Sequence, residues 1–112
     1  MIKVYIASPY TIGDQARNVY NSLYVANNLI SLGLCPYCPL LTHFQHMMFP
    51  QSYEKWLELD FEWIRQSDCL LRLSGESKGA DREIEHATEN NIPVFYNINE
   101  LLYFYGREES TL

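Results

Sequence analysis

The segment from Ser74 to Glu83 has the composition of a ligand site at the start of a helix. A polar, glycine-containing turn leads into the helix, and the free backbone N–H groups at a helix N-terminus attract anions. Ser77 can cap the helix or offer its hydroxyl to a phosphate, and Gly79 allows the backbone to approach a ligand closely. Glu83 lies about one turn into the helix, where the helix dipole favours its ionised form. An ionised, partly desolvated carboxylate can attack a sugar carbon, although the same pattern also fits an ordinary capped helix start.

A second polar segment, residues 7–11, follows the first apolar run of the chain. The hydroxyls of Ser8 and Tyr10 and the guanidinium of Arg17 could bind a sugar or a phosphate. The alternative is a plain connection between a strand and a helix, with Asp14 as the helix cap.

The third candidate is Asp60, which stands four residues after Trp56 and four before Ile64 on a mostly apolar helical stripe. An acid in that place lies either at the solvated border of the stripe or in a cleft, and position alone favours the border. His43 follows the end of a predicted strand, so it could border the pocket of a base or similar ring.

The elements that must position these residues alternate between strand and helix. The predicted strands cover residues 2–7, 34–41, 68–73 and 92–97; the predicted helices cover residues 14–32, 53–66, 79–90 and 99–105; residues 42–52 form a loop. This order predicts an α/β fold with a doubly wound parallel sheet of four to five strands, flavodoxin-like or Rossmann-like, in a single domain. The proline-interrupted second strand belongs at a sheet edge.

A sheet of this kind binds its ligand beyond the carboxyl ends of the strands, at the switch in strand order. Residues 7–11 and 74–79 follow the first and third strands, so we expect them to meet at one cleft. We expect residues 1–107 to form the domain and residues 108–112 a short C-terminal tail.

The composition excludes several classes of function. With 112 residues and a net charge of −6, the chain is a poor partner for a nucleic-acid polymer or an anionic membrane. No apolar run approaches the ~18 residues of a membrane helix, and the N-terminus has the pattern of a strand rather than a signal peptide. Three cysteines do not form a disulfide framework, so a reducing, cytoplasmic setting is expected.

Taken together, the three segments resemble the nucleoside 2-deoxyribosyltransferase superfamily. The resemblance is closest to its short deoxyribosyltransferase-like members and to the 2′-deoxynucleoside 5′-phosphate N-hydrolases, and it extends from about Lys3 to Phe95. The stretches that carry it are Lys3-Val4-Tyr5-Ile6-Ala7-Ser8-Pro9-Tyr10, Leu59-Asp60 with Ser67-Asp68-Cys69-Leu70-Leu71, and Ser77-x-Gly79-Ala80-x-x-Glu83-Ile84-x-x-Ala87 followed by Ile92-Pro93-Val94.

The resemblance implies that Glu83 attacks C1′ of a nucleoside or nucleotide, releases the base and carries a deoxyribosyl ester, which water or a second base then resolves. It implies that Tyr5 hydrogen-bonds the nucleophile, that Asp60 serves the base or its protonation, and that Ser77 contacts a phosphate. No metal and no organic cofactor is implied. A homo-oligomer is implied, because the transferases complete their site with a neighbouring subunit, and residues 101–105 are a plausible contact.

The chain departs from the nucleotide-hydrolysing branch at two places. Its first turn is Ser-Pro-Tyr-Thr-Ile-Gly-Asp rather than a turn rich in glycine and arginine. Asp81 and Arg82 replace residues that are often small or apolar, and one of them would repel a phosphate while the other would attract it.

Three other functions stay open on sequence alone. The same cleft could bind a nucleotide or sugar phosphate without cleaving it. Cys35-Pro36-Tyr37-Cys38 spells a glutaredoxin tetrapeptide, although the redox mechanism needs the first cysteine at a helix N-terminus and this motif follows a helix. Cys35, Cys38, His43 and His46 could also be zinc ligands, with a shorter cysteine-to-histidine gap than zinc fingers have.

Overall fold

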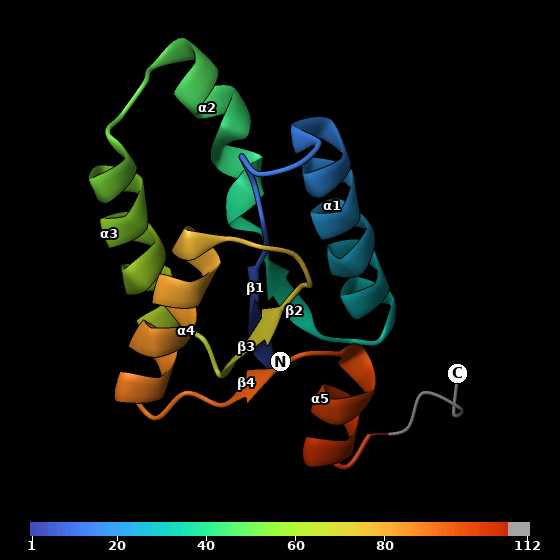
Figure 1. The fold of residues 1–112 in the computed structure, drawn as a ribbon. Helices are drawn as coiled ribbons and strands as arrows, with labels where there is room; N and C mark the ends of the chain where they lie inside the picture. Colours follow the sequence, from blue (N-terminus) through green and yellow to red (C-terminus); the bar gives the residue numbers. More distant parts are fainter. Residues whose placement is uncertain (108–112) are drawn as a thin grey trace.

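The computed structural model describes residues 1–107 as a parallel sheet with helices on both faces (Figure 1). The strands are β1 (Lys3–Ala7), β2 (Cys35–Tyr37), β3 (Cys69–Arg72) and β4 (Val94–Phe95). The helices are α1 (Gln15–Ser31), the 3₁₀ helix η1 (Pro39–Thr42), α2 (His43–Met48), α3 (Tyr53–Arg65), α4 (Lys78–Glu89) and α5 (Ile98–Phe104). All strands are parallel in the order β2-β1-β3-β4, which confirms the predicted fold class with four strands.

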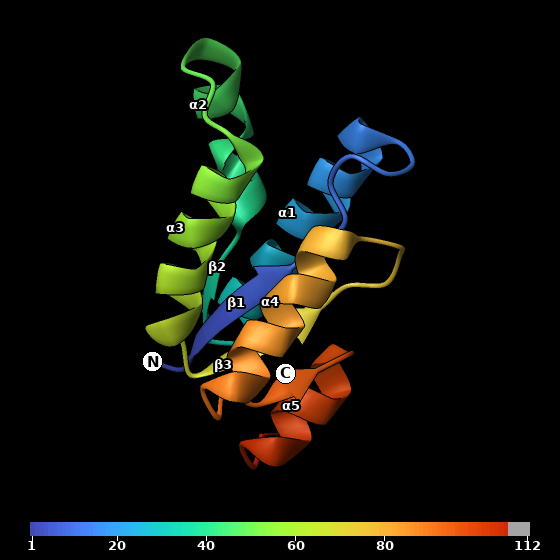
Figure 2. The same cartoon turned by 60° about the vertical axis from the view of Figure 1, so that its left-hand side comes forward.

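Alternation along the strands divides the core into two layers, because successive side chains of a strand point to opposite faces. Val4 and Ile6 of β1 pack with α1 and α5, whereas Tyr5 and Ala7 pack with α3 and α4. Figures 1 and 2 show these two pairs of helices on opposite sides of the sheet. The strands β1 and β3 are parallel neighbours and end at the same edge of the sheet, where the ligand cleft is expected.

The predicted helix caps are confirmed. Asp14 caps α1 by accepting a hydrogen bond from the backbone N–H of Arg17, and Ser77 caps α4 by accepting one from Ala80. Gly33 follows α1 at φ 81°, a left-handed conformation that glycine adopts without strain. These local signals place the ends of both helices within a residue or two of the prediction.

The large apolar residues of α1 do not all face the core. Tyr20, Leu23 and Ile30 are exposed, whereas Ser22 and Leu29 face the core together with Ala26. A shift of one residue turns a helix face by about 100°, and this helix has apolar residues on more than one stripe. The sheet surface, which the local pattern does not contain, selects the stripe that is buried.

Two predicted strands and one predicted loop also differ from the structure. The second strand ends at Tyr37 instead of residue 41, because Pro39 lacks an N–H and begins η1. The last strand is only Val94–Phe95, since Asn97 caps α5 through the N–H of Glu100. The predicted loop 42–52 contains α2, a six-residue helix with no buried residue and therefore no apolar period to detect.

Within residues 1–107, no helix combines the length and the apolar character needed to cross a bilayer. The predicted tail, residues 108–112, lies outside the described residues.

Candidate active site

A cavity of about 660 Å³ opens where β1 and β3 end. It is bordered by the turn after β1, by η1 and α2, by one side of α3 and by the first turns of α4. Of the predicted site residues, those that line it are Ser8, Tyr10, His43, Asp60, Ser77, Gly79 and Glu83. Two segments far apart in the sequence thus meet at one cleft, as the topology predicts.

An acid cluster, defined here as Tyr5, Asp60 and Glu83, lies at one wall of the cavity; Asp60 and Glu83 line it, and Tyr5 is buried behind them. Glu83 faces the sheet from α4 and is only 5% exposed. The fully buried hydroxyl of Tyr5 donates a hydrogen bond to Glu83 Oε2. Asp60 reaches the same place from α3, so three elements converge on one carboxylate.

Burial raises the pKa of Glu83 well above its usual value, and the negative charge of Asp60 raises it further. The hydrogen bond from Tyr5 and the charge of Arg72 lower that pKa only in part. Burial likewise raises the pKa of Asp60 to about 6, against the lowering effect of its contacts with Glu83 and Tyr5. Desolvation and a like charge thus oppose the ionised form of Glu83, which the helix dipole was expected to favour.

Two carboxyl groups so close together ionise as a pair and share a proton over a range of pH. The pair can give up that proton to a group leaving a bound molecule and still keep one ionised oxygen. Burial also raises the pKa of Tyr5, so this hydroxyl stays protonated and keeps its role as a donor to Glu83. The position of Asp60 next to Glu83 corrects the expectation of a solvated border, because α3 packs against α4 along this face.

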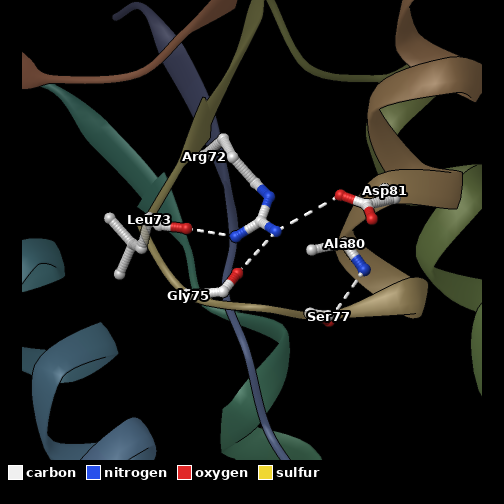
Figure 3. A network of polar contacts seen from close by, with 6 residues as sticks. All are labelled: Arg72, Leu73, Gly75, Ser77, Ala80 and Asp81. Atoms are coloured by element: carbon white, nitrogen blue, oxygen red, sulfur yellow. Dashed lines mark hydrogen bonds and ion pairs between the residues drawn. The ribbon is translucent and has the colours of Figure 1, made fainter.

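Arg72, which was not predicted as a site residue, lies beside the acid cluster. Its buried guanidinium donates to the carbonyl oxygens of Leu73 and Gly75 and pairs with Asp81, as Figure 3 shows. An arginine within the apolar run Leu70-Leu71-Arg72-Leu73 was the signal available, since a charged side chain enters a buried strand only with partners.

An aromatic cluster, defined here as Tyr10, His43, His46 and Trp56, lines another part of the cavity. A hydrogen bond joins the Tyr10 hydroxyl to Nδ1 of His43. Nδ1 of His46 accepts the indole N–H of Trp56 at 2.7 Å, which leaves Nε2 of His46 as an N–H donor. His46 and Trp56 were not predicted as site residues, because their meeting depends on the placement of α2 against α3.

The first turns of α4 supply the cationic part of the cavity, with Lys78 and Arg82 among the lining residues. Ser77 accepts the N–H of Ala80 at 3.1 Å, so its own proton is available to a ligand. Arg82 pairs with Glu54 at 3.1 Å, whereas Asp81 turns to Arg72 and does not line the cavity. The acid that could have repelled an anion is thus held away from it.

The Tyr53 hydroxyl lies close to Gly79. A Cβ atom at Gly79 would meet this oxygen at 3.2 Å, which is tight for a carbon–oxygen contact. Gly79 is therefore in close contact with a protein side chain, and a larger residue there would require Tyr53 to shift.

Arg17 is the one predicted site residue that the structure keeps away from this region. Its exposed guanidinium lies over the ring of Tyr20, 5.8 Å from the centroid, and it does not line the cavity.

The structure does not support the two alternative functions based on the cysteines, the redox motif and the zinc site. Cys35 lies in β2 rather than at a helix N-terminus, so it lacks the position that the redox mechanism needs. Cys38 is buried and hydrogen-bonded to Ser22, and burial raises its pKa. Within the described part of the chain, no three His, Cys, Asp or Glu side chains form a group that could hold a metal ion, so the proposed zinc ligands do not converge.

Comparison with known proteins agrees with this architecture. A family model described as Domain of unknown function (DUF7768) matches residues 2–97. A solved structure of a 2-deoxyribosyltransferase from the psychrotolerant bacterium Bacillus psychrosaccharolyticus has the same fold, with a TM-score of 0.57 and 22% sequence identity. The match covers 82% of this chain and 69% of that chain. No curated protein matches the sequence.

Proposed function

This chain belongs to the DUF7768 family, and from that premise we propose that it cleaves or exchanges the N-glycosidic bond of a 2′-deoxynucleoside or its 5′-monophosphate. The observation that carries the proposal is the convergence of Tyr5, Asp60 and Glu83 on one wall of a cavity of about 660 Å³. A cavity of that volume suits a small-molecule ligand. The likeness in fold to a 2-deoxyribosyltransferase supports the same chemistry.

In the proposed reaction the acid pair begins with one proton. Glu83 attacks C1′ of the sugar through a carboxylate oxygen, while the bond from C1′ to the base nitrogen breaks and its electron pair leaves with the base. Asp60 donates the shared proton to the departing base, so that the base leaves neutral. The product of this step is a deoxyribosyl ester of Glu83 and an ionised Asp60.

The second step regenerates the protein. Water attacks C1′, Asp60 accepts a proton from it, and the bond from C1′ to Glu83 breaks with its electron pair returning to the carboxylate. Each attack inverts C1′, so the two together retain its configuration. A second base in place of water would give exchange instead of hydrolysis. No metal or organic cofactor takes part in either step.

Other groups of the cavity bind the substrate in this proposal. Tyr5 orients Glu83, and the hydroxyl groups of Ser8 and Tyr10 lie where the sugar would sit. The N-terminus of α4 with Ser77, Gly79 and Lys78 can receive the 5′ end, including a phosphate. His43 and the rest of the aromatic cluster border the base.

We also propose that the protein acts as a homo-oligomer, with small molecules rather than nucleic acid or membrane as its other partners. Leu101 and Leu102 are buried in the core, so the stretch 101–105 offers mainly Tyr103 and Phe104 to another copy.

The experiment that tests the function is a panel of nucleosides and 5′-monophosphates, with the free base followed by chromatography. We expect release of base from at least one 2′-deoxy substrate, and addition of a second base separates exchange from hydrolysis. In Glu83→Gln the rate should fall on the order of 10⁴-fold or more, as for loss of a nucleophile, while the substrate still binds.

Glu85→Gln is the matched control, since this acid lies on the same helix but does not line the cavity. If Glu83→Gln keeps full turnover, the mechanism is wrong. If the wild-type protein binds nucleotides but releases base from none, the site is a binding module.

A further inference from the structure

Arg72 is the buried charge that the proposed mechanism does not use. Its side chain is 9% exposed, whereas that of its ion-pair partner Asp81 is 69% exposed. The alternation of β3 places Arg72 on the same face as Leu70, towards α4. A buried guanidinium is retained only when its donors are satisfied, and this one has three acceptors.

The three acceptors of Arg72 belong to consecutive parts of one connection. The carbonyl of Leu73 directly follows β3. The carbonyl of Gly75 lies in the turn, 2.8 Å from Nη2 of Arg72, and the carboxylate of Asp81 lies in the first turn of α4, 3.3 Å from the same atom. Figure 3 shows the guanidinium between these groups, beside the Ser77 cap of α4. Residues 74–76 are exposed and bury no apolar side chain, so polar contacts have to hold the turn.

The same turn packs against the first ligand segment. Gly75 has φ 120°, and a Cβ atom there would lie 2.8 Å from Cγ of Pro9. Pro9 stands between Ser8 and Tyr10, which both line the cavity. The hydrogen bond from Arg72 to the Gly75 carbonyl therefore holds the turn that touches both ligand segments.

We infer that Arg72 is a positioning residue of the proposed reaction: its guanidinium locks the β3–α4 turn against the β1–α1 turn and so fixes Glu83 relative to Tyr5 and Asp60. This inference rests on the proposed function and deepens it. Asp81 lies two positions before Glu83 in the same turn of α4, so a shift of the clamped turn moves the nucleophile. A displacement of about 1 Å is enough to slow such a reaction on the order of 100-fold.

The positive charge of Arg72 also favours the proposed reaction, because it stabilises the ionised form of Glu83. The ionisable groups that face Glu83 are Tyr5 from β1, Tyr37 from β2, Asp60 from α3 and Arg72 from β3. Among these, Arg72 is the cation, and its charge lowers the pKa of Glu83. Removal of the cation should leave the acid pair harder to ionise, whereas lysine would restore the charge without the three-way contact.

The test compares Arg72→Gln, Arg72→Lys and the control Arg65→Gln in the full chain. Arg65 is an exposed helix arginine with its own ion pair to Glu62, so its loss changes the net charge equally. In Arg72→Gln we expect kcat at pH 7 to fall about 10- to 100-fold, KM to change less than about threefold, and the acid limb of the kcat–pH profile to move to higher pH. Arg72→Lys should keep the limb near its wild-type position with kcat still reduced, and Arg65→Gln should match the wild type.

A second readout does not depend on activity. ¹³C NMR of labelled glutamate side chains should show the Glu83 carboxyl titrating at higher pH in Arg72→Gln than in the wild type, with Arg65→Gln unchanged. If Arg72→Gln keeps the wild-type kcat and limb, or if Arg65→Gln shifts both equally, the inference is wrong although the function stands. If circular dichroism shows that Arg72→Gln does not fold, Arg72→Lys serves as the test. A wild-type kcat in Arg72→Lys would contradict the positioning role of the Arg72 guanidinium.

The two proposals can fail separately. If the wild-type protein releases no base from any substrate while the NMR titration still moves in Arg72→Gln, the proposed reaction is wrong and the coupling of Arg72 to the acid pair remains.

Discussion

The acid cluster and the aromatic cluster border the same cavity, but they are held in different ways. Tyr5 and Glu83 of the acid cluster are buried; Tyr5 belongs to the sheet itself, and Glu83 to a helix that packs directly on it. His43 and His46 come from α2, a helix without a buried residue. The proposed bond-breaking groups are thus fixed by the core, whereas two of the groups that would border the base, His43 and His46, lie on a helix that buries no side chain.

The other side chains of α2 strengthen this contrast. Phe44, Met47 and Met48 are each more than 60% exposed, although they are large and apolar.

The acid cluster, in contrast, reduces the stability of the fold. Burial raises the pKa of Asp60 and of Glu83, so keeping these groups ionised in the folded protein costs free energy. Variants of the acid cluster should therefore change rate and stability together, and variants of the aromatic cluster should change mainly substrate preference.

After the loss of the nucleophile in Glu83→Gln, the largest effect on rate should come from Asp60→Asn. Asparagine keeps the shape but cannot transfer a proton, and positioned acid–base groups contribute about 10²- to 10⁴-fold. We expect kcat to fall by that factor, measured as release of base from the best substrate of the panel. The first step needs a proton on Asp60, whose pKa is raised by burial, so the wild-type rate should fall at high pH as the acid pair loses its last proton, and this alkaline limb should be lost in the variant. An unchanged alkaline limb in Asp60→Asn would assign it to another group.

Tyr5→Phe should have the next largest effect. The variant loses the hydrogen bond to Glu83, and bonds to charged groups contribute about 1.5–3 kcal/mol, or roughly 10- to 100-fold in rate. Because the Tyr5 bond lowers the pKa of Glu83, its loss should also move the acid limb of the rate to higher pH. Tyr37→Phe is the control, since its ring packs on Tyr5 5.8 Å away but does not bond Glu83. Equal losses in both variants would point to packing rather than to the hydrogen bond.

Glu83→Gln should stabilise the folded protein at neutral pH while it abolishes activity. The pKa values of Glu83 and Asp60 are raised on folding, so the folded state binds more protons than the unfolded state above pH ~4. Wild-type stability should therefore fall as the pH rises from 5 to 7, and removing one acid should recover about 1–2 kcal/mol at pH 7. Thermal or urea unfolding of both proteins across this range measures it.

Glu54→Gln serves as the control for stability. Glu54 is exposed, and its hydrogen bond with Arg82 lowers its pKa, so its removal should not stabilise the protein. A wild-type protein that gains stability between pH 5 and 7 would contradict the assignment of a strained acid pair.

The smallest effect is expected in the aromatic cluster. His46→Ala removes the acceptor of the Trp56 indole and a donor that faces the cavity region, so we expect KM to rise about 3- to 10-fold for some bases and not for others. kcat should change less than about threefold. Met47→Ala, on the exposed side of the same helix, should leave both constants unchanged. A uniform loss of kcat for every base in His46→Ala would remove the contrast between the two clusters.

Much of the fold could be predicted because its signals are local. Alternation within the strands, the caps Asp14 and Ser77, and the succession of strands and helices fix a parallel sheet and the direction of each connection. The same pattern places the exits of the first and third strands at one edge, where Ser8 and Ser77 do line a common cavity. Helix α2 was not predicted, because a short exposed helix has no periodic pattern of apolar residues.

Caps, strand alternation and chain order depend on neighbouring residues, so they already indicate which groups are available for chemistry and which end of the sheet holds them. The place of Asp60 beside Glu83, the contacts of Arg72 with the turn and the position of Arg17 outside the cavity depend instead on how distant segments pack together. The pKa of Glu83 is raised, against the effect expected of the helix dipole, because burial and the charge of Asp60 come from α3 and the sheet rather than from the helix that carries the residue. Proximity and desolvation are sums over segments distant in the chain, and no local pattern contains them.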